Sequence, residues 1–220
     1  MHIYPAILTE SVPLAEEQLA RVVGIPEIEA VQIDIIDGEY ADNLTISPID
    51  LIGTNFGELR VDFHLMTIEP VNFIYECKQV ENVRAVIAQI ERMTSQKEFI
   101  REALQFSVQP GLSLDLYTPV ESIHEESWEE LRVICLMGNL AGHQGEPFKG
   151  KVVLDKIREV NEIKKKLDLQ QLEVIVDIGV NEDTISQIAK AGADGVAVGS
   201  LLWKSEDIEA QLQRLEENAH

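Results

Sequence analysis

Eight short apolar runs, separated by stretches with helical periodicity, recur along the whole chain and constrain its fold more than any other feature. The runs lie at residues 5–8, 30–35, 59–65, 84–90, 104–108, 131–137, 172–176 and 195–198. Short apolar segments of this kind are typical of strands that are buried on both faces. Between two of them, Val153, Ile157 and Val160 repeat at helical spacing. This alternation indicates repeated βα units and a parallel sheet.

Eight such units predict a closed (β/α)8 TIM barrel. The chain of 220 residues is long enough, since such barrels need about 200 to 250 residues. A doubly wound, flavodoxin-like sheet shows the same alternation, but it usually has about five or six strands and a phosphate-binding loop after the first. No such loop follows residues 5–8. Because no linker or change of composition divides the chain, we expect residues 1–220 to form a single TIM-barrel domain.

The charge of the chain restricts its partners. The sequence has 39 acidic and 18 basic residues, and its net charge of −21 repels both nucleic-acid phosphates and anionic lipids. No apolar stretch approaches the roughly 20 residues that a membrane helix needs. We therefore expect a cytoplasmic protein that binds neither nucleic acid nor membranes. We also expect any phosphate group to be bound by backbone N–H groups rather than by clusters of Lys and Arg.

Polar residues that end apolar runs are informative, because a barrel of this kind carries its catalytic side chains at the C-terminal ends of its strands. Gln32 and Asp34 are two residues apart and so share one strand face, while His64 and Asp177 end two other runs. A single buried histidine is more often part of a core than a ligand. Two aspartates and a histidine that converge from separate strands, however, indicate a site rather than three independent caps.

Several segments of the chain, taken in order, resemble the ribulose-phosphate 3-epimerase family. They are residues 5–8, 31–43, 62–66 with 69–70, 176–181, 191–194 and 198–200. The resemblance covers nearly the whole chain. It implies a metal-assisted TIM barrel that interconverts D-ribulose 5-phosphate and D-xylulose 5-phosphate, and it implies a homo-oligomer.

The resemblance assigns Asp34 and Asp177 as an acid/base pair on opposite faces of the substrate. One aspartate would remove the proton at carbon 3, and the other would deliver a proton from the far side. The enediolate formed between these steps carries negative charge, which a metal or preorganised donors must stabilise.

In the family both aspartates also bind a divalent metal (Mn, Zn, Fe or Mg) together with two histidines. His64 matches one histidine, and Gln32 stands at the position of the other. The metal site would then consist of Gln32, Asp34, His64 and Asp177. Because zinc favours imidazole and thiolate ligands, such a site would suit Mn²⁺ or Mg²⁺ better, or would hold no metal.

The resemblance also predicts two sets of residues that contact the substrate. The phosphate group would bind at Gly145, Gly179, Gly199 and Ser200. The rest of the substrate would contact Met66, Met137 and Gly142. Two residues depart from the family here: Ala6 replaces a serine, and Ile178 replaces one glycine of a pair. Since a β-branched side chain disfavours positive φ, Ile178 could hinder close approach of the backbone to a phosphate.

Three functions therefore stay open. The first is a pentulose-phosphate epimerase, and the second is an enzyme acting on another ketose phosphate. The third is a non-catalytic sugar-phosphate-binding barrel that has lost the family metal site, which the departures at Ala6, Gln32 and Ile178 favour. Related decarboxylase barrels carry a lysine two residues after the second-strand aspartate, where this chain has Ile36.

Overall fold

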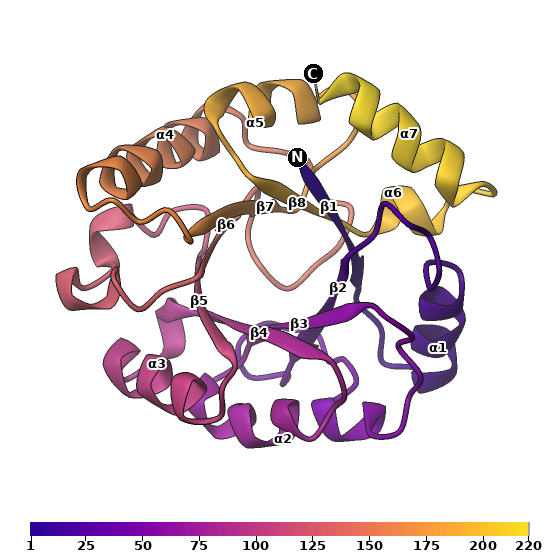
Figure 1. The fold of residues 1–220 in the computed structure, drawn as a ribbon, viewed down its shortest axis with the longest axis horizontal. Helices are drawn as coiled ribbons and strands as arrows, with labels where there is room; N and C mark the ends of the chain where they lie inside the picture. Colours follow the sequence, from indigo (N-terminus) through magenta and orange to yellow (C-terminus); the bar gives the residue numbers. More distant parts are fainter. Residues whose placement is uncertain (220) are drawn as a thin grey trace.

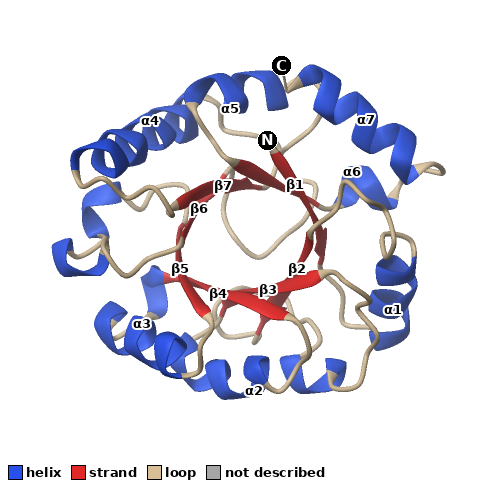
Figure 2. Ribbon diagram, viewed as in Figure 1, coloured by secondary structure: helices blue, strands red, loops and turns tan. Residues whose placement is uncertain are grey.

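A closed barrel of eight parallel strands forms the centre of the protein, as a computed structural model that describes residues 1–219 shows (Figures 1 and 2). The strands are β1 (His2–Ile7), β2 (Ala30–Ile36), β3 (Arg60–Met66), β4 (Val83–Gln89), β5 (Gln109–Leu114), β6 (Val133–Met137), β7 (Glu173–Asp177) and β8 (Gly195–Val198). Each strand pairs with the next, and β8 closes the barrel on β1. The predicted TIM-barrel fold is confirmed.

Helices surround the barrel on its outside (Figure 1). The α-helices are α1 (Val12–Ala20), α2 (Ile74–Lys78), α3 (Gln96–Gln105), α4 (Lys151–Lys166), α5 (Ile185–Ala191), α6 (Ser200–Trp203) and α7 (Ile208–Asn218). The short 3-10 helices are η1 (Pro48–Leu51), η2 (Pro70–Phe73), η3 (Ile90–Arg92), η4 (Val120–Ser122) and η5 (Glu125–Ser127). Two connections, β2–β3 and β5–β6, carry 3-10 helices in place of an α-helix. Within residues 1–219, no helix is long and apolar enough to cross a membrane.

The strands divide their side chains between two cores. On β2, Val31 and Ile33 belong to the larger core, which lies between the strands and the helices. Ala30 and Ile36 belong to a smaller core inside the barrel. Because side chains alternate along a strand, Asp34 shares the inward face with Ala30 and Ile36. The pleat of β2 therefore turns this aspartate into the barrel.

The fifth strand lies later in the chain than its apolar pattern predicts. A strand at residues 104–108 is wrong, because α3 continues to Gln105 and β5 begins only at Gln109. Pro110 and Gly111 inside β5 look like a turn in the sequence. Packing explains the glycine, since a Cβ there would lie 2.9 Å from a side-chain carbon of Ile87 and 3.0 Å from Val133. The other seven predicted strands overlap the observed ones.

Near the N-terminal ends of the strands, four polar side chains inside the barrel form what we call the base cluster: Tyr4, Asp62, Arg84 and Glu173. Arg84 Nε donates to Asp62 Oδ1 at 2.8 Å, and Arg84 Nη1 donates to Glu173 Oε2 at 3.2 Å. The Tyr4 hydroxyl donates to Glu173, and the guanidinium lies 4.9 Å from the centre of the Tyr4 ring. One permanent cation thus serves both carboxylates of the base cluster.

Candidate active site

Four buried side chains meet nearer the C-terminal ends of the strands and form what we call the site cluster: Gln32, Asp34, His64 and Asp177. Asp34 and His64 are paired in register on β2 and β3, whereas Gln32 lies one pleat lower, opposite Asp62. Asp177 is the last residue of β7. The site cluster is almost sealed from solvent, since Asp177, its most accessible member, is 7% exposed. The four residues predicted as a metal site thus lie together.

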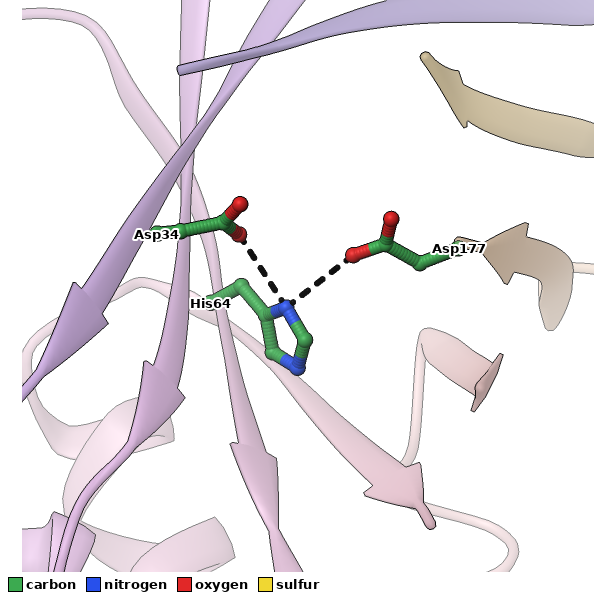
Figure 3. A group of neighbouring side chains, drawn as sticks. All are labelled: Asp34, His64 and Asp177. Atoms are coloured by element: carbon green, nitrogen blue, oxygen red, sulfur yellow. Dashed lines mark hydrogen bonds and ion pairs between the residues drawn. The ribbon is translucent and has the colours of Figure 1, made fainter. Parts of the chain in front are cut away.

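The His64 ring lies between the two aspartates (Figure 3). Its Nδ1 atom is 3.2 Å from Asp34 Oδ1 and 3.4 Å from Asp177 Oδ2. Ionised carboxylates can only accept hydrogen bonds, so Nδ1 carries the hydrogen in these contacts. On the other side of the ring, His64 Nε2 lies 3.2 Å from the side-chain nitrogen of Gln89, the last residue of β4.

Gln32 also contacts both aspartates. Its Nε2 atom donates to Asp34 Oδ1 at 2.8 Å and to Asp177 Oδ2 at 2.8 Å, and it lies 3.4 Å from His64 Nδ1. Its other terminal atom, Oε1, is buried without a hydrogen-bond partner in the described part of the chain. The amide therefore binds the carboxylates through one end only.

Burial and close charges change the proton affinities of the site cluster. Burial raises the pKa of Asp34, and the charge of Asp177 adds to this effect, while hydrogen bonds from His64 and Gln32 oppose it. Burial alone would lower the pKa of His64, but its hydrogen bonds to Asp177 and Asp34 outweigh that effect and raise the pKa to about 9. In the metal-free protein at neutral pH, the His64 side chain is consequently a positively charged imidazolium.

Asp34, His64 and Asp177 could hold a divalent metal ion. Each offers one ligand atom, and these atoms lie within 4.8 Å of one another. Gln32 does not offer a ligand as it stands, because an amide N–H group is a donor and cannot coordinate a cation. Turning the amide over would present Oε1, an oxygen ligand that Mn²⁺ and Mg²⁺ accept. Three residues therefore fit a metal directly, and the fourth fits after rotation.

The second oxygen of Asp177 is held by the backbone. Ile178 N–H donates to Asp177 Oδ1 at 2.7 Å. Despite its β-branched side chain, Ile178 has a φ of 72°, in the left-handed region. Such a conformation costs about 1 to 3 kcal/mol. The β-branched side chain of Ile178 disfavours positive φ, but the residue adopts it here. Its N–H group then points at the carboxylate of Asp177.

A pocket opens over the site cluster, and both predicted substrate sets line it. The lining includes Asp34, Asp177, Met66, Met137, Gly142, Gly145, Gly179, Gly199 and Ser200. The β6–α4 loop is fixed over this pocket by two hydrogen bonds: Asn43 Nδ2 donates to the Gly142 carbonyl at 2.8 Å, and Gln144 Nε2 donates to the Ala6 carbonyl at 3.3 Å. Ala6 lacks the hydroxyl group of the serine that the family has at this position, but the backbone carbonyl of Ala6 still binds the loop.

Three further residues at the site have no role predicted from the sequence: Gln89, which contacts His64, and Gln144 and Lys204, which line the pocket. Gln89 lies two residues beyond Ile87, which faces the barrel interior, so the strand period could have found it. Lys204 follows Ser200 by one helical turn, and it is the one Lys or Arg side chain among the described residues of the pocket lining. Gln144 lies in an irregular loop, and no periodic signal indicates its direction.

Comparison with known proteins agrees with this arrangement. A family model described as "Ribulose-phosphate 3 epimerase family" matches residues 2–203. The ribulose-phosphate 3-epimerase of Helicobacter pylori (strain J99) is 28% identical over 218 residues, which cover 98% of this chain and 97% of that protein. The ribulose-phosphate 3-epimerase of Bacillus subtilis (strain 168) is 30% identical over 181 residues, which cover 81% and 82% of the two chains.

Solved structures give the same fold at lower sequence identity. A mutant tryptophan synthase alpha-subunit from Pyrococcus furiosus is similar with a TM-score of 0.68 and 19% sequence identity, over 99% of this chain and 97% of that one. At this identity the likeness concerns the barrel alone.

Proposed function

The chain belongs to the ribulose-phosphate 3-epimerase family, and on that premise we propose that it interconverts D-ribulose 5-phosphate and D-xylulose 5-phosphate. The proposal depends above all on one observation: Asp34 and Asp177 enter one pocket from different strands of the barrel. Two carboxylates placed in this way can reach opposite faces of a single substrate carbon. Inversion of that carbon by proton transfer needs this arrangement.

In the proposed reaction, one aspartate removes the proton at carbon 3, and the other returns a proton to the opposite face. A positioned carboxylate contributes about 10²- to 10⁴-fold to the rate of such a step. Because burial raises the pKa of Asp34, this carboxylate binds a proton more readily than an exposed aspartate does. A higher pKa brings it closer to the value that suits a general base near neutral pH.

Negative charge develops on the substrate oxygens as the proton leaves carbon 3, and two sources of positive charge are available. His64, whose pKa is raised to about 9, supplies a protonated imidazole in the metal-free protein. A divalent ion held by Asp34, His64 and Asp177 would act there as a Lewis acid toward the substrate oxygens. The oxygen-rich donor set favours Mn²⁺ or Mg²⁺ over Zn²⁺.

The phosphate end of the substrate would bind in the same pocket. We assign it to the backbone N–H groups of Gly145, Gly179, Gly199 and Ser200, which share the pocket lining. Lys204 adds the formal positive charge that a phosphate dianion needs in a chain with a net charge of −21. Met66, Met137 and Gly142 would contact the sugar carbons.

Exchange of the hydrogen at carbon 3 with deuterium from the solvent tests this proposal directly. The purified protein is incubated in D₂O with ribulose 5-phosphate and with Mn²⁺, Mg²⁺, Zn²⁺ or Fe²⁺ in turn, and mass spectrometry follows the sugar phosphate. We expect deuterium at carbon 3 and the appearance of xylulose 5-phosphate. No exchange with any cation would contradict the proposal.

Two further measurements separate the alternatives. A panel of pentulose and hexulose phosphates, tested in the same way, would identify a different ketose substrate by its faster exchange. If no ketose phosphate exchanges but ribulose 5-phosphate still raises the melting temperature, the chain is a sugar-phosphate-binding barrel without epimerase activity. The amide nitrogen that Gln32 directs at both aspartates is the observation that favours this second candidate.

A further inference from the structure

Among residues 1–219, Gln32 is the one side chain that donates hydrogen bonds to both aspartates through separate N–H groups of the same atom. We propose that Gln32 is a positioning residue: its amide holds Asp34 and Asp177 at a fixed separation in the cation-free protein, and it turns over to present Oε1 when a divalent cation binds. The catalytic meaning of this inference rests on the proposed function. The orientation of the amide is independent of the proposed function.

The chemistry of the carboxylates dictates which end of the amide faces them. Ionised Asp34 and Asp177 can only accept hydrogen bonds, and an amide nitrogen carries two N–H donors. One N–H group can therefore serve each carboxylate, at the 2.8 Å distances observed for both. With Oε1 inward, the amide oxygen and the two carboxylate oxygens would meet, all bearing negative charge, at a site whose members are at most 7% exposed.

The outward end of the amide has no partner that would hold it in place. Oε1 of Gln32 is buried and lacks a hydrogen bond to any of residues 1–219. Turning the amide over therefore breaks the two bonds to the carboxylates and changes the 3.4 Å contact with His64 Nδ1, but it breaks no bond at Oε1. The charge around the inward end, on the two carboxylates and on His64, is then the determinant of which atom faces inward.

A cation reverses that determinant. A divalent ion such as Mg²⁺ lies about 2.0 to 2.1 Å from its oxygen ligands. An ion bound to Asp34 and Asp177 at this distance would meet the two N–H groups of Gln32 head on, because Nε2 is hydrogen-bonded to the same two oxygens. The amide must turn, and its two hydrogen bonds are lost, before the fourth ligand is in place. The clamp and the cation thus compete for the same carboxylate oxygens.

Nuclear magnetic resonance tests the orientation directly in the full-length protein. Protein labelled with ¹⁵N is prepared with chelator, and the Gln32 side-chain signals are assigned by their absence from the Gln32→Glu variant. If that variant does not fold, Gln32→Asn serves for the assignment. Without cation, we expect both amide protons to be shifted downfield and to exchange slowly with solvent. With saturating Mg²⁺ or Zn²⁺, which are diamagnetic, both signals should move toward the position of an amide without these hydrogen bonds.

Metal affinity supplies a second readout, one that a purely structural role would not change. Glutamate offers an oxygen in either orientation and has no N–H group to displace, so the Gln32→Glu variant should bind Mn²⁺ more tightly than the unmodified chain, by calorimetric titration. Gln96→Glu is the matched control. Gln96 is also a buried glutamine, 6% exposed, but its amide bonds Ser122 and His124 rather than the aspartates. Its replacement should leave the Mn²⁺ affinity unchanged.

The inference fails if the Gln32 amide signals stay the same on saturation with Mg²⁺ and Zn²⁺, or if these amide protons exchange freely in the cation-free protein. It also fails if Gln32→Glu binds Mn²⁺ no more tightly than the Gln96→Glu control. Neither measurement requires turnover. An inactive protein with a turning amide would overturn the proposed function alone, and an active protein with a fixed amide would overturn this inference alone.

Discussion

Each end of the barrel interior holds two carboxylates, and the two ends differ in whether a basic side chain neutralises them. The base cluster contains the carboxylates of Asp62 and Glu173, and Arg84 binds both of them. The site cluster also contains two carboxylates from different strands, but no Lys or Arg side chain forms an ion pair with them in the described chain.

Because of this difference, we expect the base cluster to contribute to stability and the site cluster to contribute to function. A buried carboxylate with a permanent cation changes little with its surroundings, whereas a buried pair without one must recruit a proton or a metal ion. At the base end, the cation is part of the sequence. At the site end, the positive charge comes from the solution, as the His64 proton or as a metal ion. This agrees with the usual division of such barrels, which carry activity at the C-terminal ends of the strands and stability at the other end.

Neutralising one carboxylate at each end should produce the largest contrast. Asp177→Asn should reduce the proposed epimerase rate by at least about 10²- to 10⁴-fold, because it removes one proton-transfer group. The substitution is nearly isosteric, and His64 keeps its contact with Asp34 in the variant, so the melting temperature should fall by less than it does in Asp62→Asn. Deuterium exchange at carbon 3 and differential scanning calorimetry measure the two effects.

Asp62→Asn is the control for this contrast. It removes a carboxylate of similar burial, 1% exposed, from the base cluster. We expect the melting temperature to fall while the exchange rate of the folded protein stays the same. Equal losses of activity in both variants would show that the two ends do not have separate roles.

Removing the cation of the base cluster should have the largest effect on stability. Arg84→Met leaves the buried Asp62 and the half-buried Glu173 without their cation, and breaking a buried pair such as Arg84–Asp62 costs about 3 to 5 kcal/mol. Urea unfolding of the chelated protein measures the loss. The rate per folded molecule should not change, because Arg84 lies away from the pocket.

The double variant Arg84→Met with Asp62→Leu tests the reason for that loss. If uncompensated charge causes it, removing the carboxylate as well should restore part of the stability, since apolar replacements of buried ion pairs are often nearly neutral. A double variant less stable than Arg84→Met would instead indicate that packing of the two side chains dominates.

Most of the fold follows from the apolar pattern, because seven of its eight strands overlap the apolar runs that predict them. The exception is β5, where Pro110 and Gly111 hide a strand that packing requires. Sequence patterns record propensity, and they do not record the close approach of Ile87 and Val133 that makes glycine necessary. That information exists only once neighbouring strands are in register.

The site residues likewise divide into those whose placement the sequence predicts and those whose role depends on local geometry. Asp34, His64 and Asp177 could be predicted to converge because each lies toward the C-terminal end of a buried strand, and these ends gather on one side of the barrel. The donor role of Gln32 could not be predicted, since it depends on which end of an amide faces two carboxylates. That Ile178 adopts positive φ and donates to Asp177 is likewise a matter of local geometry. The extent of the domain over residues 1–220 stays a prediction.

The stability of the metal-free protein should fall as the pH rises above neutrality, because the site cluster holds its positive charge as a proton. The pKa of His64 is about 9 in the folded protein and about 6.5 in an unfolded chain. A raised pKa contributes stability that is fully present below pH 6.5 and is lost as the pH approaches 9. The expected loss is about 3 kcal/mol. The raised pKa of Asp34 acts in the same direction, since protonation again favours the folded state.

Urea unfolding in chelator between pH 6 and pH 9.5 measures this loss. The His64→Gln variant can still donate to the aspartates but cannot titrate, so its stability should change less over the window. In the base cluster, Arg84 should keep its charge over this window, because its hydrogen bonds and ion pairs with Asp62 and Glu173 outweigh burial and raise its pKa above its usual high value. A steep loss that persists in His64→Gln would assign the pH dependence to another group.

A divalent cation should produce the smallest effect, and it should act at one end of the barrel alone. Adding Mn²⁺ at ten times its dissociation constant to the chelated protein stabilises the folded state by about 1.4 kcal/mol. The gain should increase from pH 6.5 toward pH 9, because the ion and the proton compete for Nδ1 of His64. Arg84→Met should keep the full gain, since its cation is lost from the other cluster, while Asp34→Asn should lose most of it. If Arg84→Met lost the gain as well, the two clusters would be coupled through Gln32, which is paired in register with Asp62 and donates to both aspartates of the site cluster. The comparison of the two ends would then describe one continuous network rather than two separate sites.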